Sequence, residues 1–175
     1  QTLRHIERTI EMSLTLAPER FAVFGYAHVP HFKKHMNLIP AETLPDAEAR
    51  VAQFELAHTM LRANGYEAVG LDHFALPDDT LAVAQRTGRL ARNFQGYTTD
   101  DAPALIGLGA SSISALPQGY AQNLPEVPEY RTAILAGELA VARGIALDDD
   151  DRLRRAIIER LMCDLAVDLD AVSAP

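Results

Sequence analysis

The fold class follows from residues 2–26, which read TLRHIERTIEMSLTLAPERFAVFGY. The first half of this stretch predicts a helix that ends before Pro18. Its apolar residues recur at helical spacing and are Leu3, Ile6, Ile10 and Leu14. The apolar run Phe21–Tyr26 is typical of a short strand buried on both faces. A helix, a short turn and a buried strand form the repeat of a parallel α/β architecture, so this stretch predicts an α/β fold.

The following segments continue the alternation. Residues 28–45 hold three prolines and three histidines and predict a loop with one helical turn. A second helix is predicted from Asp46 to Ala63, and Asn64-Gly65 is a typical stop signal. The apolar stripe of this helix comprises Ala47, Val51, Phe54, His58 and Leu61. A strand over Tyr66–Leu71 and a helix near 77–85 follow.

The second half of the chain has a different pattern. From Asn93 to Gln122 glycines separate short segments, which predicts antiparallel strands and turns. Two helices are predicted near 126–142 and 149–164. The acidic run Asp148–Asp151 stands before the last helix, where negative charge is favourable at the positive end of the helix dipole.

Composition limits the classes of function. The chain has 175 residues, is 48% hydrophobic and 23% charged, and carries a formal net charge of −8. This charge argues against a nucleic-acid-binding surface, and no apolar run approaches the ~20 residues of a membrane span. No signal peptide is visible. The single cysteine, Cys163, excludes an internal disulfide and fits a reducing compartment, so we expect a cytoplasmic protein.

Two glycine-containing segments are candidates for chemistry. In Asn93–Thr99 (NFQGYTT), Phe94 offers a stacking face and Gln95 a donor and an acceptor, which suits a flat ligand with polar edges. The alternative is a β-turn with Phe94 in the core and Gln95 in water. In Gly107–Ile113, two glycines weaken a strand unless something approaches its backbone closely. The alternative there is a glycine-bearing strand edge.

Polar side chains elsewhere support weaker hypotheses. Asp72-His73 directly follows a predicted strand, where α/β active sites lie, although Asp72 could equally cap a turn. Arg86, Arg89 and Arg92 are close in sequence and could bind substrate carboxylates, or could be solubilising residues.

Three histidines suggest a metal site. The spacing of His31 and His35 predicts one helical face, which His28 could reach, and such a set could bind zinc or nickel. Lys33 and Lys34 would repel a cation, which argues against a functional metal site. The alternative is that the histidines bind a metal only fortuitously.

Several segments together resemble oxygen-independent coproporphyrinogen III oxidase, a radical S-adenosylmethionine family of heme and porphyrin biosynthesis. The matching segments are Phe24–His28, Gly70–Asp79, Leu81–Arg86 and Asn93–Thr99, extended by Gly107–Ser114 and Tyr120–Asn123. The resemblance implies an α/β fragment of a partial (β/α) barrel with added antiparallel strands and C-terminal helices. We expect residues 1–125 to form the second part of the barrel with its β extension, and 126–175 to lead into the C-terminal domain.

The resemblance also implies a chemistry. Members of this family hold a 4Fe–4S cluster on a CxxxCxxC motif and bind two molecules of S-adenosylmethionine. They oxidatively decarboxylate two propionates of coproporphyrinogen III to give protoporphyrinogen IX. By motif position, Ala27 matches a residue that contacts the second S-adenosylmethionine, and Ile113 one that contacts the cluster-bound molecule. Phe94 and Gln95 match active-site residues, and Phe94 and Ile113 would help to exclude water.

The sequence departs from the family in its cysteines. It has no CxxxCxxC motif, because Cys163 stands alone, and it lacks the glycine-rich S-adenosylmethionine segment. It also opens at Gln1 inside helical periodicity and closes at Asp168–Ala171 as though cut. We therefore expect a fragment of this oxidoreductase that alone is inactive, binds no cofactor and self-associates through exposed strand edges. The alternatives are a heme-binding radical-SAM relative (a heme chaperone) and a metal-binding module built on the three histidines.

Overall fold

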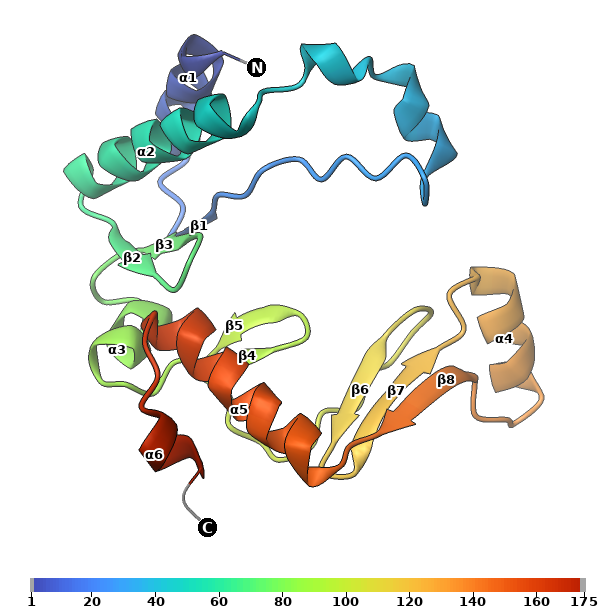
Figure 1. The fold of residues 1–175 in the computed structure, drawn as a ribbon. Coiled ribbons are helices and arrows are strands. Elements are labelled where there is room, and N and C mark those ends of the chain that lie inside the picture. Colours follow the sequence, from blue (N-terminus) through green and yellow to red (C-terminus); the bar gives the residue numbers. More distant parts are fainter. Residues whose placement is uncertain (1, 174–175) are drawn as a thin grey trace. The chain divides into compact units, whose positions relative to one another are not determined.

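The computed structural model describes residues 2–173, which form two compact units, one up to Arg89 and one from Leu90 onward. Figure 1 shows the helices and strands in chain order. Both units combine helices with antiparallel sheets, so the mixed α/β class expected from the sequence is confirmed. Within residues 2–173, none of the helices has the length and apolar character that crossing a bilayer requires.

The first unit contains a three-stranded sheet in the order β1-β3-β2. Its strands are β1 (Arg20–Ala22), β2 (Glu67–Val69) and β3 (His73–Ala75). Only residues 70–72 separate β2 from β3, which permits an antiparallel pair but no crossover to a parallel one. β1 also pairs antiparallel with β3. The parallel repeat expected here is therefore wrong for the strands that the structure describes.

The strand expected over Phe21–Tyr26 is shorter and less buried than predicted. β1 ends at Ala22, and the ladder closes with the backbone N–H of Val23 donating to the carbonyl of Asp72 at 2.7 Å. Beyond that point β3 supplies no further partner, and the side chain of Phe24 is 77% exposed. The apolar run therefore continues as an extended segment along the surface of the unit.

Helices α1 (Leu3–Leu14) and α2 (Ala47–Ala63) confirm the two predicted helices. The carboxylate of Asp46 caps α2 by accepting from the N–H of Ala49 at 2.8 Å, and Gly65 follows the helix with a positive φ of 88°. The predicted stripe is wrong at Ala47, which is exposed, and at Val51, which is 57% exposed. Between β1 and α2 the chain forms two short 3-10 helices, Lys34–Leu38 and Ala41–Thr43.

The core of the first unit lies where both helices meet the sheet. Its buried residues are Ile10, Ala57, Leu61, Tyr66 and Phe74. The half-buried ring of His58 packs edge-on against Phe74 at a centroid distance of 5.4 Å. Tyr66 packs edge-on against Phe21 at 5.0 Å and donates its hydroxyl to the carbonyl of Pro18 at 2.6 Å. The core therefore joins both helices to the sheet of this unit.

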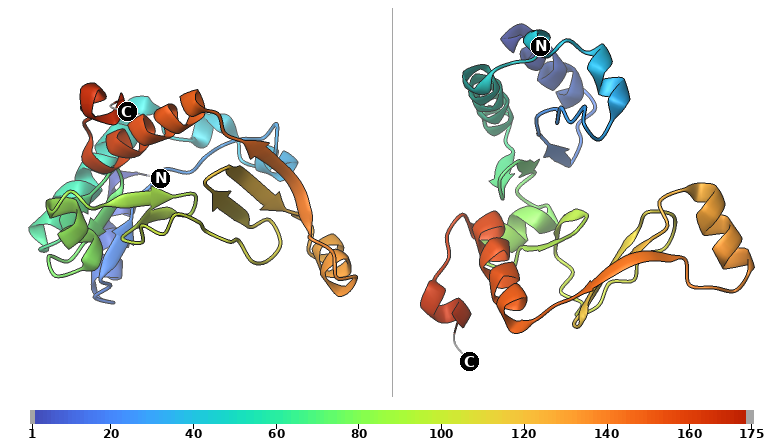
Figure 2. Two further views of the ribbon diagram at one scale, coloured as in Figure 1. Left: turned by 90° about the horizontal axis from the view of Figure 1, so that it is seen from below. Right: turned by 45° about the vertical axis from the view of Figure 1, so that its right-hand side comes forward.

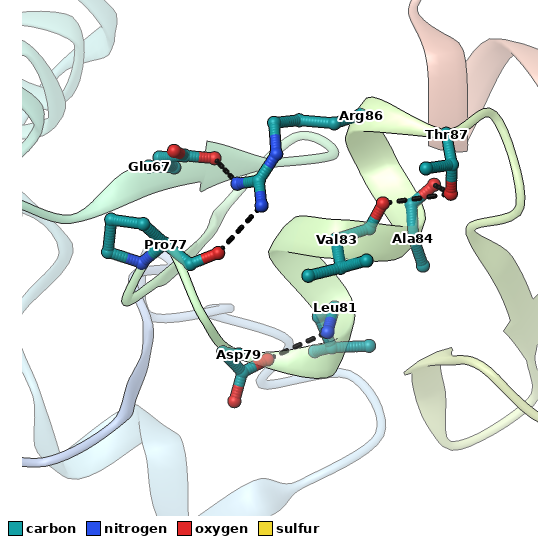
Figure 3. A network of polar contacts seen from close by, with 8 residues as sticks. All are labelled: Glu67, Pro77, Asp79, Leu81, Val83, Ala84, Arg86 and Thr87. Carbon is teal, nitrogen blue, oxygen red and sulfur yellow. Dashed lines mark hydrogen bonds and ion pairs between the residues drawn. The ribbon is translucent and has the colours of Figure 1, made fainter.

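Helix α3 (Thr80–Arg86) follows β3 and is held at both ends (Figure 3). The carboxylate of Asp79 accepts from the N–H of Leu81 at 2.7 Å. At the other end, the guanidinium of Arg86 pairs with Glu67 of β2 and donates to the carbonyl of Pro77 at 2.8 Å. These contacts confirm the helix predicted after Pro77 and fix it to the sheet.

Replacement of Asp79 by Ala is expected to lower the free energy of unfolding by about 1–2 kcal/mol, because the helix loses its N-cap. The ion pair of Asp79 with Arg20 at 2.6 Å adds little, since the arginine side chain is about half exposed. Urea unfolding followed by circular dichroism measures the change. Asp78→Ala, at the exposed neighbouring position, is the control, and an equal effect of both variants would contradict the capping role.

The second unit contains a hairpin and a second sheet. The hairpin joins β4 (Ala91–Asn93) and β5 (Gly96–Thr98). The sheet has the order β6-β7-β8, all antiparallel, as Figure 2 shows. Its strands are β6 (Ile113–Leu116), β7 (Gly119–Asn123) and β8 (Val141–Ala146). The antiparallel strands predicted between Asn93 and Gln122 are thus confirmed.

The helix predicted over 126–142 is wrong in its second half. Helix α4 spans Val127–Leu135, and Gly137 then adopts a positive φ of 75° that ends the helical path. The chain returns as β8, which pairs with β7. β7 precedes residue 125 and its partner β8 follows it, so this position lies inside the second unit. A domain division at residue 125 remains a prediction for the full-length protein.

The last predicted helix is confirmed as α5 (Asp149–Asp164), followed by α6 (Leu169–Ser173). Asp148 caps α5 by accepting from the N–H of Asp151 at 2.9 Å, and Asp151 completes the capping box by accepting from the N–H of Asp148. The acidic run therefore serves the helix N-terminus, as the sequence indicates.

Candidate functional site

The β4–β5 turn presents the two residues predicted to be in the active site. Asn93 closes this turn, because its side-chain oxygen accepts from the N–H of Gln95 at 2.8 Å and of Gly96 at 3.2 Å. Phe94 and Gln95 are the turn residues, and the ring of Phe94 is 65% exposed. The alternative that placed Phe94 in the core is therefore wrong. An aromatic ring and an amide are instead exposed on a turn of defined shape.

A pocket of about 250 Å³ lies beside this turn, within the second unit. Phe94 and Arg92 line it from the hairpin, and Ala115 and Tyr120 from the sheet. Helix α5 closes it with Arg155, Ile158, Glu159 and Met162. The carboxylate of Glu159 accepts from the backbone N–H of Arg92 at 3.2 Å, and the hydroxyl of Tyr97 donates to the carbonyl of Met162 at 2.9 Å. These two contacts hold the hairpin against the helix.

The α5 residues of this pocket were not predicted from the sequence. Arg155, Ile158, Glu159 and Met162 recur at spacings of three and four residues and so share one helical face. That face carries charged as well as apolar side chains, whereas the pattern of an amphipathic helix singles out only its apolar positions. A mixed stripe of this kind is the signal that could have identified them.

The segment Gly107–Ser112 forms a loop held by its own unit. The side-chain amide of Asn123 donates to the carbonyls of Gly107 and Gly109 at 3.1 and 3.0 Å. The N–H of Gly109 donates to the hydroxyl of Tyr130 at 3.1 Å. A Cβ at Gly107 would lie 2.9 Å from the backbone of Ile113, so the close approach that the glycine permits is made by the chain itself.

Ile113, the predicted S-adenosylmethionine contact, is half-buried at the start of β6. Its strand register opposite Gln122 is fixed by the sheet, and the glycine loop packs against its backbone. The side chain is therefore carried by rigid structure, which is what precise ligand contact requires.

Ala27, the other predicted S-adenosylmethionine contact, is exposed on the extended segment after β1. The residues just before it, Phe24–Tyr26, line a groove of about 570 Å³ in the first unit, together with residues of α1 and α2. Arg50 steadies this segment by donating to the carbonyl of Tyr26 at 3.3 Å and of Pro45 at 3.3 Å. Ala27 belongs to the first unit, and the other three predicted site residues belong to the second.

Asp72 and His73 form a pair, with 2.6 Å between Oδ1 and Nδ1. His73 begins β3 and Asp72 directly precedes it, and β3 pairs only antiparallel among the described strands, so the expected position at the carboxyl end of a parallel strand is wrong. Among the predicted arginines, Arg86 has a structural role at α3, and Arg89 donates to the hydroxyl of Thr87 at 3.2 Å. Arg92 lines the pocket beside Phe94.

The helical face predicted for His31 and His35 is wrong. His31 lies in a turn before the 3-10 helix that contains His35, so the α-helical spacing does not apply. Across residues 2–173, no group of three or more histidine, cysteine, aspartate or glutamate side chains is placed to hold a metal ion. The metal-binding alternative therefore has no geometric support in this part of the chain.

The single cysteine is a core residue. Cys163 is fully buried on α5, and burial raises the pKa of its thiol above the ordinary value. The thiol is therefore held protonated at neutral pH. The free energy of unfolding falls as the pH rises past the ordinary thiol pKa, because the thiol then ionises in the unfolded chain before it ionises in the folded one.

Comparison with known proteins gives a consistent result. No family model matches the chain. Its sequence is 52% identical over 174 residues to an oxygen-independent coproporphyrinogen III oxidase of Bradyrhizobium diazoefficiens. The aligned residues cover 99% of this chain and 39% of the relative. It is 48% identical to the enzyme of the same name from Paracoccus denitrificans, over 95% of this chain and 37% of the relative.

A solved structure shows the same similarity in three dimensions. Coproporphyrinogen III oxidase from Escherichia coli, described as a radical SAM enzyme, superposes with a TM-score of 0.88 at 40% sequence identity. The match covers 98% of this chain and 40% of that one, so the chain spans about two fifths of the relatives it matches. The resemblance seen in the sequence is confirmed: over nearly its whole length, this chain corresponds to one segment of the oxygen-independent coproporphyrinogen III oxidases.

Proposed function

We propose that this chain is part of an enzyme that oxidatively decarboxylates coproporphyrinogen III to protoporphyrinogen IX in heme biosynthesis, in the cytoplasm. The observation that carries the proposal is 52% identity over 99% of the chain to a protein named for this activity. The structural match to a radical SAM enzyme, with a TM-score of 0.88, also supports it, because the match covers 98% of the chain and so includes both units.

The proposed roles of the site residues agree with their positions. Phe94 would cover the substrate with an apolar face, and Gln95 would hydrogen-bond a polar edge of it; the exposed turn supports both roles. Ile113 and Ala27 would contact S-adenosylmethionine through small apolar surfaces. The bound cofactors would supply one-electron chemistry, while the chain's own residues bind, orient and exclude water.

The cysteine content does not fit the iron–sulfur cluster. A cluster needs several cysteine thiolates, and this chain has only Cys163, which is buried in the core of its unit. The cluster would therefore be held by residues of the full-length protein that this sequence does not include. We propose that the chain alone is inactive, and that its exposed apolar side chains favour self-association.

The test is the full-length protein encoded by the parent gene, reconstituted anaerobically and assayed for conversion of coproporphyrinogen III. Gln95→Ala is expected to lower kcat/KM by about tenfold or more, through loss of a buried hydrogen bond to the substrate. Gln118→Ala is the matched control, because Gln118 occupies the same second position in the β6–β7 turn. Absence of conversion by the unmodified protein would overturn the proposal.

A further inference from the structure

We propose that Arg92 and Arg155 form a carboxylate-binding subsite beside Phe94, which holds propionate groups of the substrate that are not decarboxylated. This inference rests on the proposed function and adds to it two residues that the family resemblance does not assign. Both line the 250 Å³ pocket of the second unit, one from the β4–β5 hairpin and one from α5.

The arginines are arranged to receive an anion. The guanidinium carbon of Arg92 lies 5.7 Å from the ring centroid of Tyr97, and that of Arg155 lies 5.6 Å from the ring centroid of Tyr120. A contact of this kind uses no hydrogen-bond acceptor, so the N–H groups of each guanidinium remain available to a carboxylate ligand. Among the described residues, neither guanidinium forms an ion pair.

The charge balance of the pocket favours a negative group. Glu159 contributes one carboxylate against the two guanidiniums, and it already accepts the backbone N–H of Arg92. The other arginines of α5 differ, because Arg152, Arg154 and Arg160 each pair with an aspartate of the same helix. The residues that line this pocket therefore carry a net positive charge.

The apolar part of the pocket identifies the rest of the ligand. Phe94, Ala115, Ile158 and Met162 line it, and Ile158 and Phe94 are largely exposed. The exposed apolar groups suit the edge of a flat ring system bearing carboxylate arms. A volume of about 250 Å³ is too small for a whole tetrapyrrole, so the pocket takes one edge of it with its propionates, while the ring lies over Phe94.

The test compares Arg92→Gln and Arg155→Gln in the full-length enzyme. Each variant is expected to raise KM for coproporphyrinogen III at least about tenfold with little change in kcat, because these contacts are made equally before and during reaction. Arg154→Gln is the matched control, since Arg154 neighbours Arg155 but pairs with Asp150. Arg155→Lys keeps a cation and should retain part of the affinity.

A binding measurement separates this inference from the proposed function. Coproporphyrin III, the stable oxidised porphyrin, is titrated against the protein and compared with its methyl ester, which lacks carboxylates. Unmodified protein should prefer the acid, and the two Gln variants should lose that preference while still binding the ester. If the enzyme is active and the Gln variants keep both KM and the preference, only this inference is wrong. If unmodified enzyme shows no conversion, the proposed function fails, and an equal affinity for acid and ester would then overturn the subsite as well.

Discussion

Replacement of Phe74 by Ala is expected to lower the free energy of unfolding by about 3–5 kcal/mol, the usual cost of removing a large buried aromatic side chain. Phe74 is 1% exposed and belongs to the core of the first unit. Its ring contacts those of Phe54 and His58 on α2, so the cavity would open between the helix and the sheet. The surrounding aromatic rings can close such a cavity only in part.

Urea unfolding followed by far-ultraviolet circular dichroism measures this effect, since the chain has no tryptophan to report by fluorescence. Phe32→Ala removes the same side chain from a position in the same unit that is 79% exposed. The control should change stability by less than about 0.5 kcal/mol. Similar losses in both variants would show that Phe74 does not organise the core.

Replacement of Gly119 by Ala is expected to destabilise the second unit by about 3 kcal/mol or more. A Cβ at this position would lie 2.0 Å from the carbonyl oxygen of Ile145 on the adjacent strand. Backbone atoms within a hydrogen-bonded ladder cannot move aside without loss of the pairing between β7 and β8. The single added methyl group should therefore separate the two strands.

Gly25→Ala is the matched control for this substitution, because the nearest atom to its added Cβ is the end of the Arg50 side chain at 3.8 Å. Gly25, like Gly119, does not have a positive φ. Hydrogen exchange at the amides of β7 and β8 measures the local effect. Unchanged protection in Gly119→Ala would show that the sheet accommodates the methyl group.

Helices α1, α2 and α5 could be predicted because their signals are local. Apolar spacing and a capping residue lie within the helix itself or one residue before it, as Asp46 and Asp148 show. The predictions over Phe21–Tyr26 and 126–142 were wrong because strand pairing decides them. Whether an apolar segment becomes a strand depends on a partner distant in sequence, β3 in one case and β7 in the other.

The candidate site divides in the same way. Phe94 and Gln95 could be identified in the sequence, since a turn with glycine and an unusual aromatic–amide pair is a short-range pattern. Gly107 was also conspicuous, but the group that approaches it proved to be the backbone of Ile113. Nothing in the sequence near Arg92 indicated that Arg155 and Tyr120 would share its pocket.

The sequence by itself determined the family resemblance, the mixed α/β class, the capped helices and the turn that carries Phe94, because each depends on residues within a few positions of one another. Only the tertiary structure decided the pairing of β1 with β3 and of β7 with β8, and the packing of the β4–β5 hairpin against α5 that brings two arginines to one pocket. Those features arise from contacts between segments tens of residues apart, whose free energies no local pattern encodes.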